Sequence, residues 1–213
     1  MDAEKTIFAP YVDQAVAESD FDNEIWQRCQ PVEIVLLWSG EPAALTRHAE
    51  ARLCWSNEAL HVRFAGAQQE PLVVSTNPVT EKKTLGLWDR DVCEIFLAPD
   101  LENPSRYFEF EAAPTGEWVD LGITLTSNGR ETDWDFASGF TTAAKLEHGQ
   151  LFVGMRIPWS EVIPKPQAGD RWGVNVFRCV GPETPDRYLV WRPTHTPEPA
   201  FHVPEAFGSL RFL

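Results

Sequence analysis

Short segments of alternating hydrophobic and polar residues recur along the whole chain. In the stretch RYFEFEAA, Phe108 and Phe110 fall on one side of an extended strand. Tyr107, Glu109 and Glu111 fall on the other side. Comparable patterns, bounded by turn residues, predict strands at residues 32–38, 52–55, 59–64, 91–98, 106–113, 117–125, 141–146, 151–157, 171–180 and 188–192, with a short strand at the C-terminus.

Helical periodicity is almost absent from the sequence. A short helix or turn is expected in residues 21–30, and one helical turn in residues 158–163, where Pro158 suits a helix start. Many short strands without long helices predict an all-β chain, an antiparallel β-sandwich of jelly-roll or immunoglobulin-like architecture with short helical turns. Residues 1–20 are expected to be an N-terminal lead-in, and residues 21–213 a single domain.

The segment LWDRDVCEIFLA, residues 87–98, combines a strand pattern with candidate chemistry. Cys93 and Ile95 alternate with Glu94, so this carboxylate shares a face with apolar neighbours. A charge in such a position is costly unless it is paired or hydrogen-bonded, which suggests that it has a role. Trp88 precedes the strand and can offer a flat stacking surface. Together they predict a small-ligand site, with a sugar as the expected ligand.

Composition narrows the classes of function. Eighteen basic and 32 acidic residues give a formal net charge of −14, which argues against nucleic acid or an anionic membrane as partner.

The N-terminus lacks the pattern of an export signal, so a cytoplasmic location is expected, or an exported one if a signal was removed. The four cysteines are widely spaced and are expected to be buried free thiols.

Five motifs occur in order: WDRDVCEIFLAP, YFEFEAAPTGEWVD, MRIPWSEV, GDRWGVNVFRC and FHVPEAFGSLRF. In this order they resemble family 9 carbohydrate-binding modules and the wider group of family 9-like proteins, from about Phe21 to the C-terminus. The resemblance implies a β-sandwich related to the DOMON-like superfamily. It also implies a site that clamps a terminal sugar between two tryptophans, with polar side chains on the hydroxyls and structural calcium elsewhere.

The resemblance also assigns site residues. Trp88 matches the first stacking tryptophan, Glu94 a hydroxyl-binding carboxylate, and Trp191, in YLVWRPT, the second tryptophan. Three further polar residues lie in matching motifs and are candidates for ligand binding: Arg106, Asn175 and Arg178. No catalytic residue is assigned, because the expected function is non-catalytic binding of a mono- or oligosaccharide end. The sugar, its anomer and the oligomeric state are left open.

Structural roles for the same residues are the alternative. Trp88 and Trp191 could belong to the core, and Glu94 could pair internally with Arg106 or Arg178. His61, on the polar side of its strand, is expected at the surface. The acidic residues of several loops could hold calcium, although none has the spacing of an EF-hand: Asp89, Asp91, Asp100, Asp120, Asp133 and Asp135.

Two other classes of function stay open. A glycoside hydrolase would need a carboxylate pair, which Glu109 and Glu111 could form with Glu94 or Asp120 nearby. A haem-binding DOMON-like domain would need axial ligands, for which the internal methionine Met155 and the tail histidines are the candidates, His195 and His202.

Overall fold

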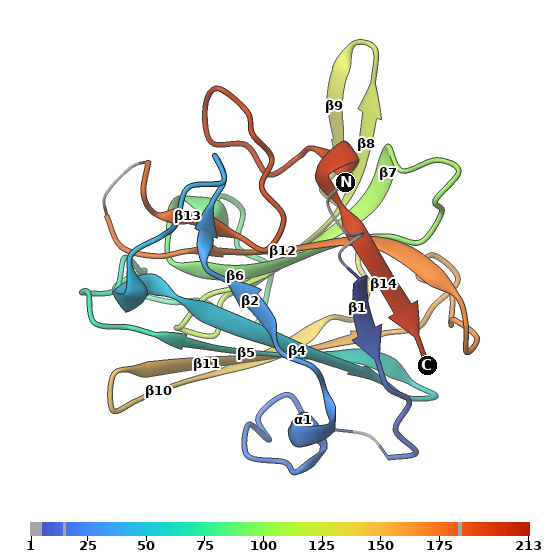
Figure 1. The fold of residues 1–213 in the computed structure, drawn as a ribbon, viewed down its shortest axis with the longest axis horizontal. Coiled ribbons are helices and arrows are strands. Elements are labelled where there is room, and N and C mark those ends of the chain that lie inside the picture. The colour runs from blue at the N-terminus through green and yellow to red at the C-terminus, as the bar shows by residue number, and fades with distance from the viewer. Residues whose placement is uncertain (1–5, 15, 183–184) are drawn as a thin grey trace.

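In the computed structural model, which describes residues 6–14, 16–182 and 185–213, two β-sheets pack as a sandwich (Figure 1). The larger sheet follows the order β1 (Thr6–Ala9), β14 (Gly208–Phe212), β12 (Arg171–Cys179), β6 (Val92–Ala98), β7 (Arg106–Ala112), β8 (Trp118–Thr126) and β9 (Gly129–Asp133). In the same sheet, β13 (Tyr188–Val190) pairs with both β12 and β3 (Leu36–Leu37). The smaller sheet follows the order β10 (Thr141–Glu147), β11 (Gln150–Pro158), β5 (Ala59–Ala67), β4 (Ala49–Trp55) and β2 (Val32–Ile34). The short helices are α1 (Ile25–Arg28), η1 (Leu45–Arg47), η2 (Leu87–Asp89) and η3 (Pro204–Ala206). The predicted β-sandwich is confirmed.

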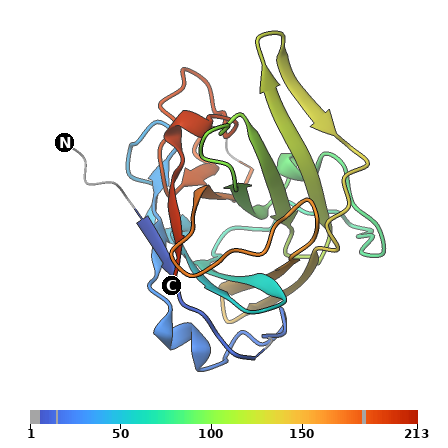
Figure 2. The same ribbon diagram turned by 90° about the vertical axis from the view of Figure 1, so that its right-hand side faces the viewer.

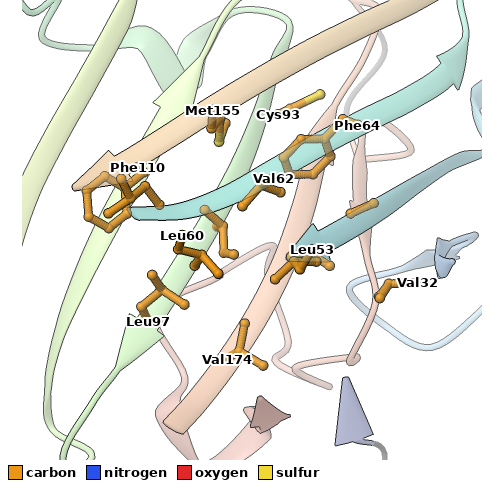
Figure 3. Close-up of a cluster of buried hydrophobic side chains, with 14 of the residues drawn as sticks. Val32, Leu53, Leu60, Val62, Phe64, Cys93, Leu97, Phe110, Met155 and Val174 are labelled. Carbon is orange, nitrogen blue, oxygen red and sulfur yellow. The ribbon is translucent and has the colours of Figure 1, made fainter. Parts of the chain in front are cut away.

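The main core lies between the two sheets (Figure 3). Leu53, Val62 and Phe64 enter it from the smaller sheet, and Leu97 and Phe110 from the larger one. These are the residues that the period-two alternation places on one face of each strand. Side chains from the two inner faces interdigitate in this layer, as in other sandwiches of packed sheets.

The outer face of the larger sheet, which points away from the smaller sheet, carries a second apolar cluster. Phe96 belongs to this cluster, whereas its chain neighbours Ile95 and Leu97 belong to the main core. The C-terminal tail covers part of the face, with Phe201 stacked on Phe177 at a ring-centroid distance of 4.1 Å. Both faces of β6 and β12 are therefore buried, whereas an antiparallel sheet commonly has one face exposed to solvent.

The predicted hairpins match the observed strands closely, but two local predictions are wrong. The single strand expected at residues 32–38 is divided, because β2 pairs in the smaller sheet and β3 in the larger. Residues 159–163, expected to complete a helical turn, contain no helix, and residues 161–163 form bends. Pro158 instead ends β11 in register with Ala59 of β5.

The N-terminal segment is part of the sandwich where the structure describes it. β1 pairs in parallel with β14, and the following residues cover the outer face of the smaller sheet together with α1 (Figure 1). This cover buries His61, which is only 1% exposed and contacts Ser56 Oγ through Nε2 at 3.1 Å. The prediction of a surface histidine is wrong, because alternation identifies the polar face of a strand but not what lies over it.

The hairpin of β8 and β9 extends beyond the body of the sandwich (Figure 2). Residues 129–133, GRETD, contain no apolar residue and belong to none of the predicted strands. They form an edge strand through backbone pairing alone, as polar edge strands commonly do. The hairpin thus adds a polar wall beside the outer face of the larger sheet.

Among the residues that the structure describes, no helix is long and apolar enough to cross a membrane. Cys29, Cys54, Cys93 and Cys179 are buried free thiols.

Candidate functional site

A cavity of about 320 Å³ opens on the outer face of the larger sheet. Its floor consists of side chains from four adjacent strands: Glu94, Phe96, Glu109, Leu121, Ile123 and Cys179. Its rim comes from η2, β9, β13 and the tail: Trp88, Arg130, Thr132, Trp134, Tyr188, Pro199, Ala200, Phe201 and His202. The volume is at the lower end of the range of about 300–1,000 Å³ typical of small-molecule sites.

Two tryptophans meet at the mouth of this cavity. Trp88 lies on η2, which follows Gly86 in a left-handed conformation with φ of 79°. Trp134 follows β9 in a turn where Asp133 Oδ1 accepts a hydrogen bond from the backbone N–H of Asp135. The two ring centroids are 6.4 Å apart and the ring planes are inclined by 39°. Trp134 is 46% exposed and Trp88 is half-buried, so both present indole surface to a ligand.

The spacing of the two rings decides how a sugar could use them. A ring held between two aromatic planes needs roughly 7–8 Å between them, because each contact takes about 3.5–4.0 Å. With ring centroids 6.4 Å apart and planes inclined by 39°, Trp88 and Trp134 leave too little room for a sugar ring between them. A sugar ring can instead stack on the indole surface that is exposed at the cavity mouth.

Trp191 does not face Trp88. Its side chain is 8% exposed and belongs to the main core, and its backbone N–H donates to the carbonyl oxygen of Val176. Alternation explains the placement, because Tyr188 at the start of β13 lines the cavity whereas Leu189 and Trp191 point into the sandwich. The predicted pairing of these two tryptophans is therefore corrected: the neighbour of Trp88 is Trp134.

The floor of the cavity contains three glutamates in contact. Glu94 on β6 lies directly opposite Glu111 on β7, and Glu109 is two residues away on the same face. One oxygen from each of the three carboxyl groups lies within 4.8 Å of the others. Their exposed fractions are 1%, 0% and 3% for Glu94, Glu111 and Glu109, so water screens their mutual repulsion little. We call Glu94, Glu109 and Glu111 the glutamate cluster.

Burial shifts the titration of all three groups in the same direction. It raises the pKa of Glu94 to about 8, and the charge of Glu109 adds to this rise. Burial is also the main cause of the raised pKa values of Glu109 and Glu111. Near neutral pH and without a bound cation, the cluster therefore carries fewer than three negative charges.

Hydrogen-bonding groups surround the cluster on the cavity side. The Cys179 thiol donates to Glu94 Oε1 at a sulfur–oxygen distance of 3.5 Å. The Tyr107 hydroxyl lies 2.8 Å from Nδ1 of His202, whose Nε2 lies 3.8 Å from Glu109 Oε2. Burial lowers the pKa of His202 to about 3, with a smaller effect of Arg130, so its ring is neutral. If the Tyr107 hydroxyl donates to Nδ1, then Nε2 carries the ring proton and points it toward Glu109.

The three polar residues that the motifs suggested lie outside the cavity. Arg178 is in register with Cys93 and points into the sandwich, where its guanidinium donates to backbone carbonyls of Arg47, His48 and Ala67. Asn175 is fully buried and bonds the backbone N–H and carbonyl of Arg192. Both stabilise the fold and contribute no group to the cavity.

Arg106 also lies elsewhere. It is exposed at the start of β7 and borders a separate hollow together with Asp100 and Phe108. Neither Arg106 nor Arg178 pairs with Glu94 in the part of the chain that the structure describes. The arginine at the cavity is Arg130 on β9.

The residues that sequence reasoning missed are mainly on the rim. Trp134 was not singled out, although TDWDF places an aromatic residue between two aspartates, a pattern that disfavours core packing. Arg130 and Thr132 belong to the unpredicted strand β9. His202 had been considered only as a haem ligand. It does not converge with Met155, which is buried in the main core.

Two of the aspartates considered for calcium are occupied by protein donors. Asp91 accepts backbone N–H groups of Val73 and Gly181. Asp120 pairs with Lys83 at 2.8 Å and accepts two hydrogen bonds from Ser138. In the described ranges of the chain, the group of side chains with the spacing of metal ligands is the glutamate cluster.

Comparisons with known proteins agree with this architecture. A search of curated proteins finds no match. A candidate carbohydrate-binding protein from Bacteroides uniformis aligns over 99% of this chain and 100% of its own, with a TM-score of 0.74 and 16% sequence identity. A family 9 carbohydrate-binding module from Caldicellulosiruptor kristjanssonii, solved with glucose, aligns over 98% and 96% of the two chains, with a TM-score of 0.66 and 19% identity. The same module was also solved with cellotriose, with 98% and 93% coverage. The model of the carbohydrate family 9 binding domain-like family matches residues 19–213, and the chain therefore belongs to this family.

Proposed function

We propose that the protein binds the end of a mono- or oligosaccharide in the outer-face cavity without chemically changing it. The observation that carries the proposal is the combination of two indole surfaces at the mouth with polar groups at the floor. Sugars need both, because the C–H faces of a ring stack on aromatic planes while the hydroxyls need fixed donors and acceptors. Membership of the family supports the proposal, as do the glucose and cellotriose complexes of the Caldicellulosiruptor kristjanssonii module.

The polar groups have complementary roles in this proposal. Trp88 and Trp134 supply the stacking surface. Glu94 and Glu109 accept hydrogen bonds from sugar hydroxyls, and Arg130 can donate to a hydroxyl oxygen from the rim. Because Glu94 has a pKa of about 8, its protonated form can also donate. A single ring of about a dozen heavy atoms at about −0.3 kcal/mol per atom gives about −4 kcal/mol, so millimolar affinity is the expected floor.

Titration with sugars tests the proposal. Glucose, xylose, cellobiose and xylobiose are added to the protein while the tryptophan fluorescence is followed. We expect saturable binding of at least one sugar, and at least tenfold weaker binding, ~1.4 kcal/mol, in Trp88→Ala because one of the two stacking surfaces is lost. Trp159→Phe, which changes a tryptophan packed against Trp172 outside the cavity, is the matched control and should bind normally. Undiminished binding by Trp88→Ala would place the sugar elsewhere.

Glycoside hydrolysis is a second candidate, with one observation in its favour. Glu94 and Glu109 both line the cavity, and Glu94 has the raised pKa that a general acid requires. The test is turnover of aryl glycosides by the wild-type protein, compared with Glu94→Gln and Glu109→Gln. Turnover that both substitutions abolish would make the protein an enzyme. Sugar binding without turnover would leave the non-catalytic function.

A further inference from the structure

The glutamate cluster lacks a positive partner at close range. Within the described part of the chain, none of its three carboxyl groups forms an ion pair with a lysine or arginine. The contact with His202 is long, at 3.8 Å, and the ring is neutral. The charge of Arg187 acts on Glu94 without forming an ion pair with it, and the Nη1 of Arg187 donates to the backbone oxygen of Asp89. Like charges directly opposite one another on neighbouring strands are destabilising, so this arrangement needs compensation.

Glu111 adds an independent observation. Its side chain is fully buried, and neither carboxyl oxygen has a hydrogen-bond donor in the structure other than a proton that it would share with Glu109. Glu109 Oε2 is in the same condition. An unpartnered buried carboxylate is expensive, because it has lost its water without gaining a donor. Both groups point to the place where the three carboxylates meet.

The number and grouping of the oxygens suit Ca²⁺. Two oxygens that bind the same Ca²⁺ at about 2.3–2.6 Å are at most about 4.6–5.2 Å apart. The oxygens of the cluster lie within 4.8 Å of one another, which is compatible with this limit. Ca²⁺ takes about six to eight oxygen ligands, whereas Mg²⁺ keeps several waters and usually binds about one or two carboxylates. Three carboxylates can supply up to six oxygens, and the cavity beside Glu94 and Glu109 gives access to water for the remaining positions.

We propose that Glu94, Glu109 and Glu111 bind a Ca²⁺ ion beneath the floor of the cavity. The ion neutralises the cluster and gives the oxygens of Glu111 the partner that the protein does not provide. This site is in the sheet, between β6 and β7, and not in the aspartate-containing loops. The alternative occupant is a proton shared between Glu109 and Glu111, which would hold the cluster together without metal.

Calorimetric titration of chelator-treated protein with CaCl₂ tests the proposal, with MgCl₂ as the comparison. We expect wild-type protein to bind Ca²⁺ at this site at least tenfold more tightly than Mg²⁺, and its melting temperature to rise with the Ca²⁺ concentration. Glu111→Gln keeps the shape of the side chain but removes one charged ligand, so it should lose one equivalent of Ca²⁺ or bind it at least tenfold more weakly. Glu41→Gln, which makes the same change at an exposed glutamate outside the cavity, is the matched control and should bind as the wild type does.

Two results would contradict the calcium proposal. Wild-type protein that binds no Ca²⁺ at millimolar concentration would overturn the proposal and leave the shared proton. Ca²⁺ binding that is unchanged in both Glu111→Gln and Glu109→Gln would overturn it as well, by placing the ion elsewhere. Using two variants and the wild type keeps the test valid if one variant fails to fold. Sugar binding is measured separately, with Trp134→Ala, so the calcium site and the proposed function can fail independently.

Discussion

At the scale of single residues, the tryptophans show how much of the site the sequence could predict. Trp88, which precedes the strand that carries Glu94 and is not part of its apolar pattern, lies beside the cavity, and its role in binding a ligand stays a prediction. The expected role of Trp191 rested on resemblance alone. The alternation in YLVW already places it on the face opposite Tyr188, and the structure buries it in the main core.

The different environments of Trp191 and Trp134 predict different effects of their removal. Trp191→Ala leaves a cavity in the packed core and should cost about 3–5 kcal/mol of unfolding free energy. Trp134→Ala removes an exposed ring and should change the unfolding free energy by no more than about 0.5 kcal/mol. Urea denaturation of the two variants and the wild type measures both quantities. A stable Trp191→Ala protein would contradict the core assignment.

His61 makes a prediction about pH. Burial, with a smaller effect of Arg156, lowers the pKa of His61 from 6.5 to about 4 in the folded protein. An unfolded chain therefore binds more protons at this site between these values, so the contribution of neutral His61 to stability is complete above pH 6.5 and is lost as the pH falls toward 4. The loss is on the order of 2–3 kcal/mol.

The measurement for His61 is the unfolding free energy of wild type and His61→Gln at several pH values. Groups common to both proteins cancel in the difference. The wild type should lose stability relative to His61→Gln as the pH falls from 6.5 to 4. Parallel curves would show that the imidazole remains accessible to protons in the folded state.

At the scale of elements, alternation predicted strands well where one face of the strand is core and the other is polar. The β4–β5 and β10–β11 hairpins and the two faces of β7 follow the pattern. The pattern fails for β12, which is buried on both faces, so the sequence could not show that Arg178 points into the sandwich and away from the cavity. It also fails for the polar edge strand β9, which provides part of the rim.

Packing of the N-terminal segment on β11 gives an element-scale prediction. A Cβ atom on Gly154 would overlap the backbone carbonyl oxygen of Glu18, so only glycine allows this close approach. Gly154→Ala should therefore displace the segment and cost about 1–3 kcal/mol of unfolding free energy. Gly122→Ala, in β8, meets its nearest neighbour at an ordinary distance of 3.4 Å and is the control. Equal stability of the two variants, measured by denaturant unfolding, would argue against tight docking of the segment.

At the scale of the whole molecule, the main core and the cavity lie on opposite faces of the larger sheet. The inner faces of the two sheets hold the main core, while the outer face of the larger sheet carries the cavity, which is lined in part by the C-terminal tail and by β8 and β9. Residues from distant parts of the chain meet there, from Trp88 to His202. A single sequence could predict the sheets from local patterns, but not which distant loops and tail residues close over one face.

A crystal structure of the protein with cellobiose tests the central claim most directly. We predict that the terminal ring of the sugar stacks on the surface formed by Trp88 and Trp134, with its hydroxyls within hydrogen-bond distance of Glu94 or Glu109. A sugar bound at another surface, or one that leaves both indoles uncovered in a protein that binds cellobiose in solution, would contradict the account.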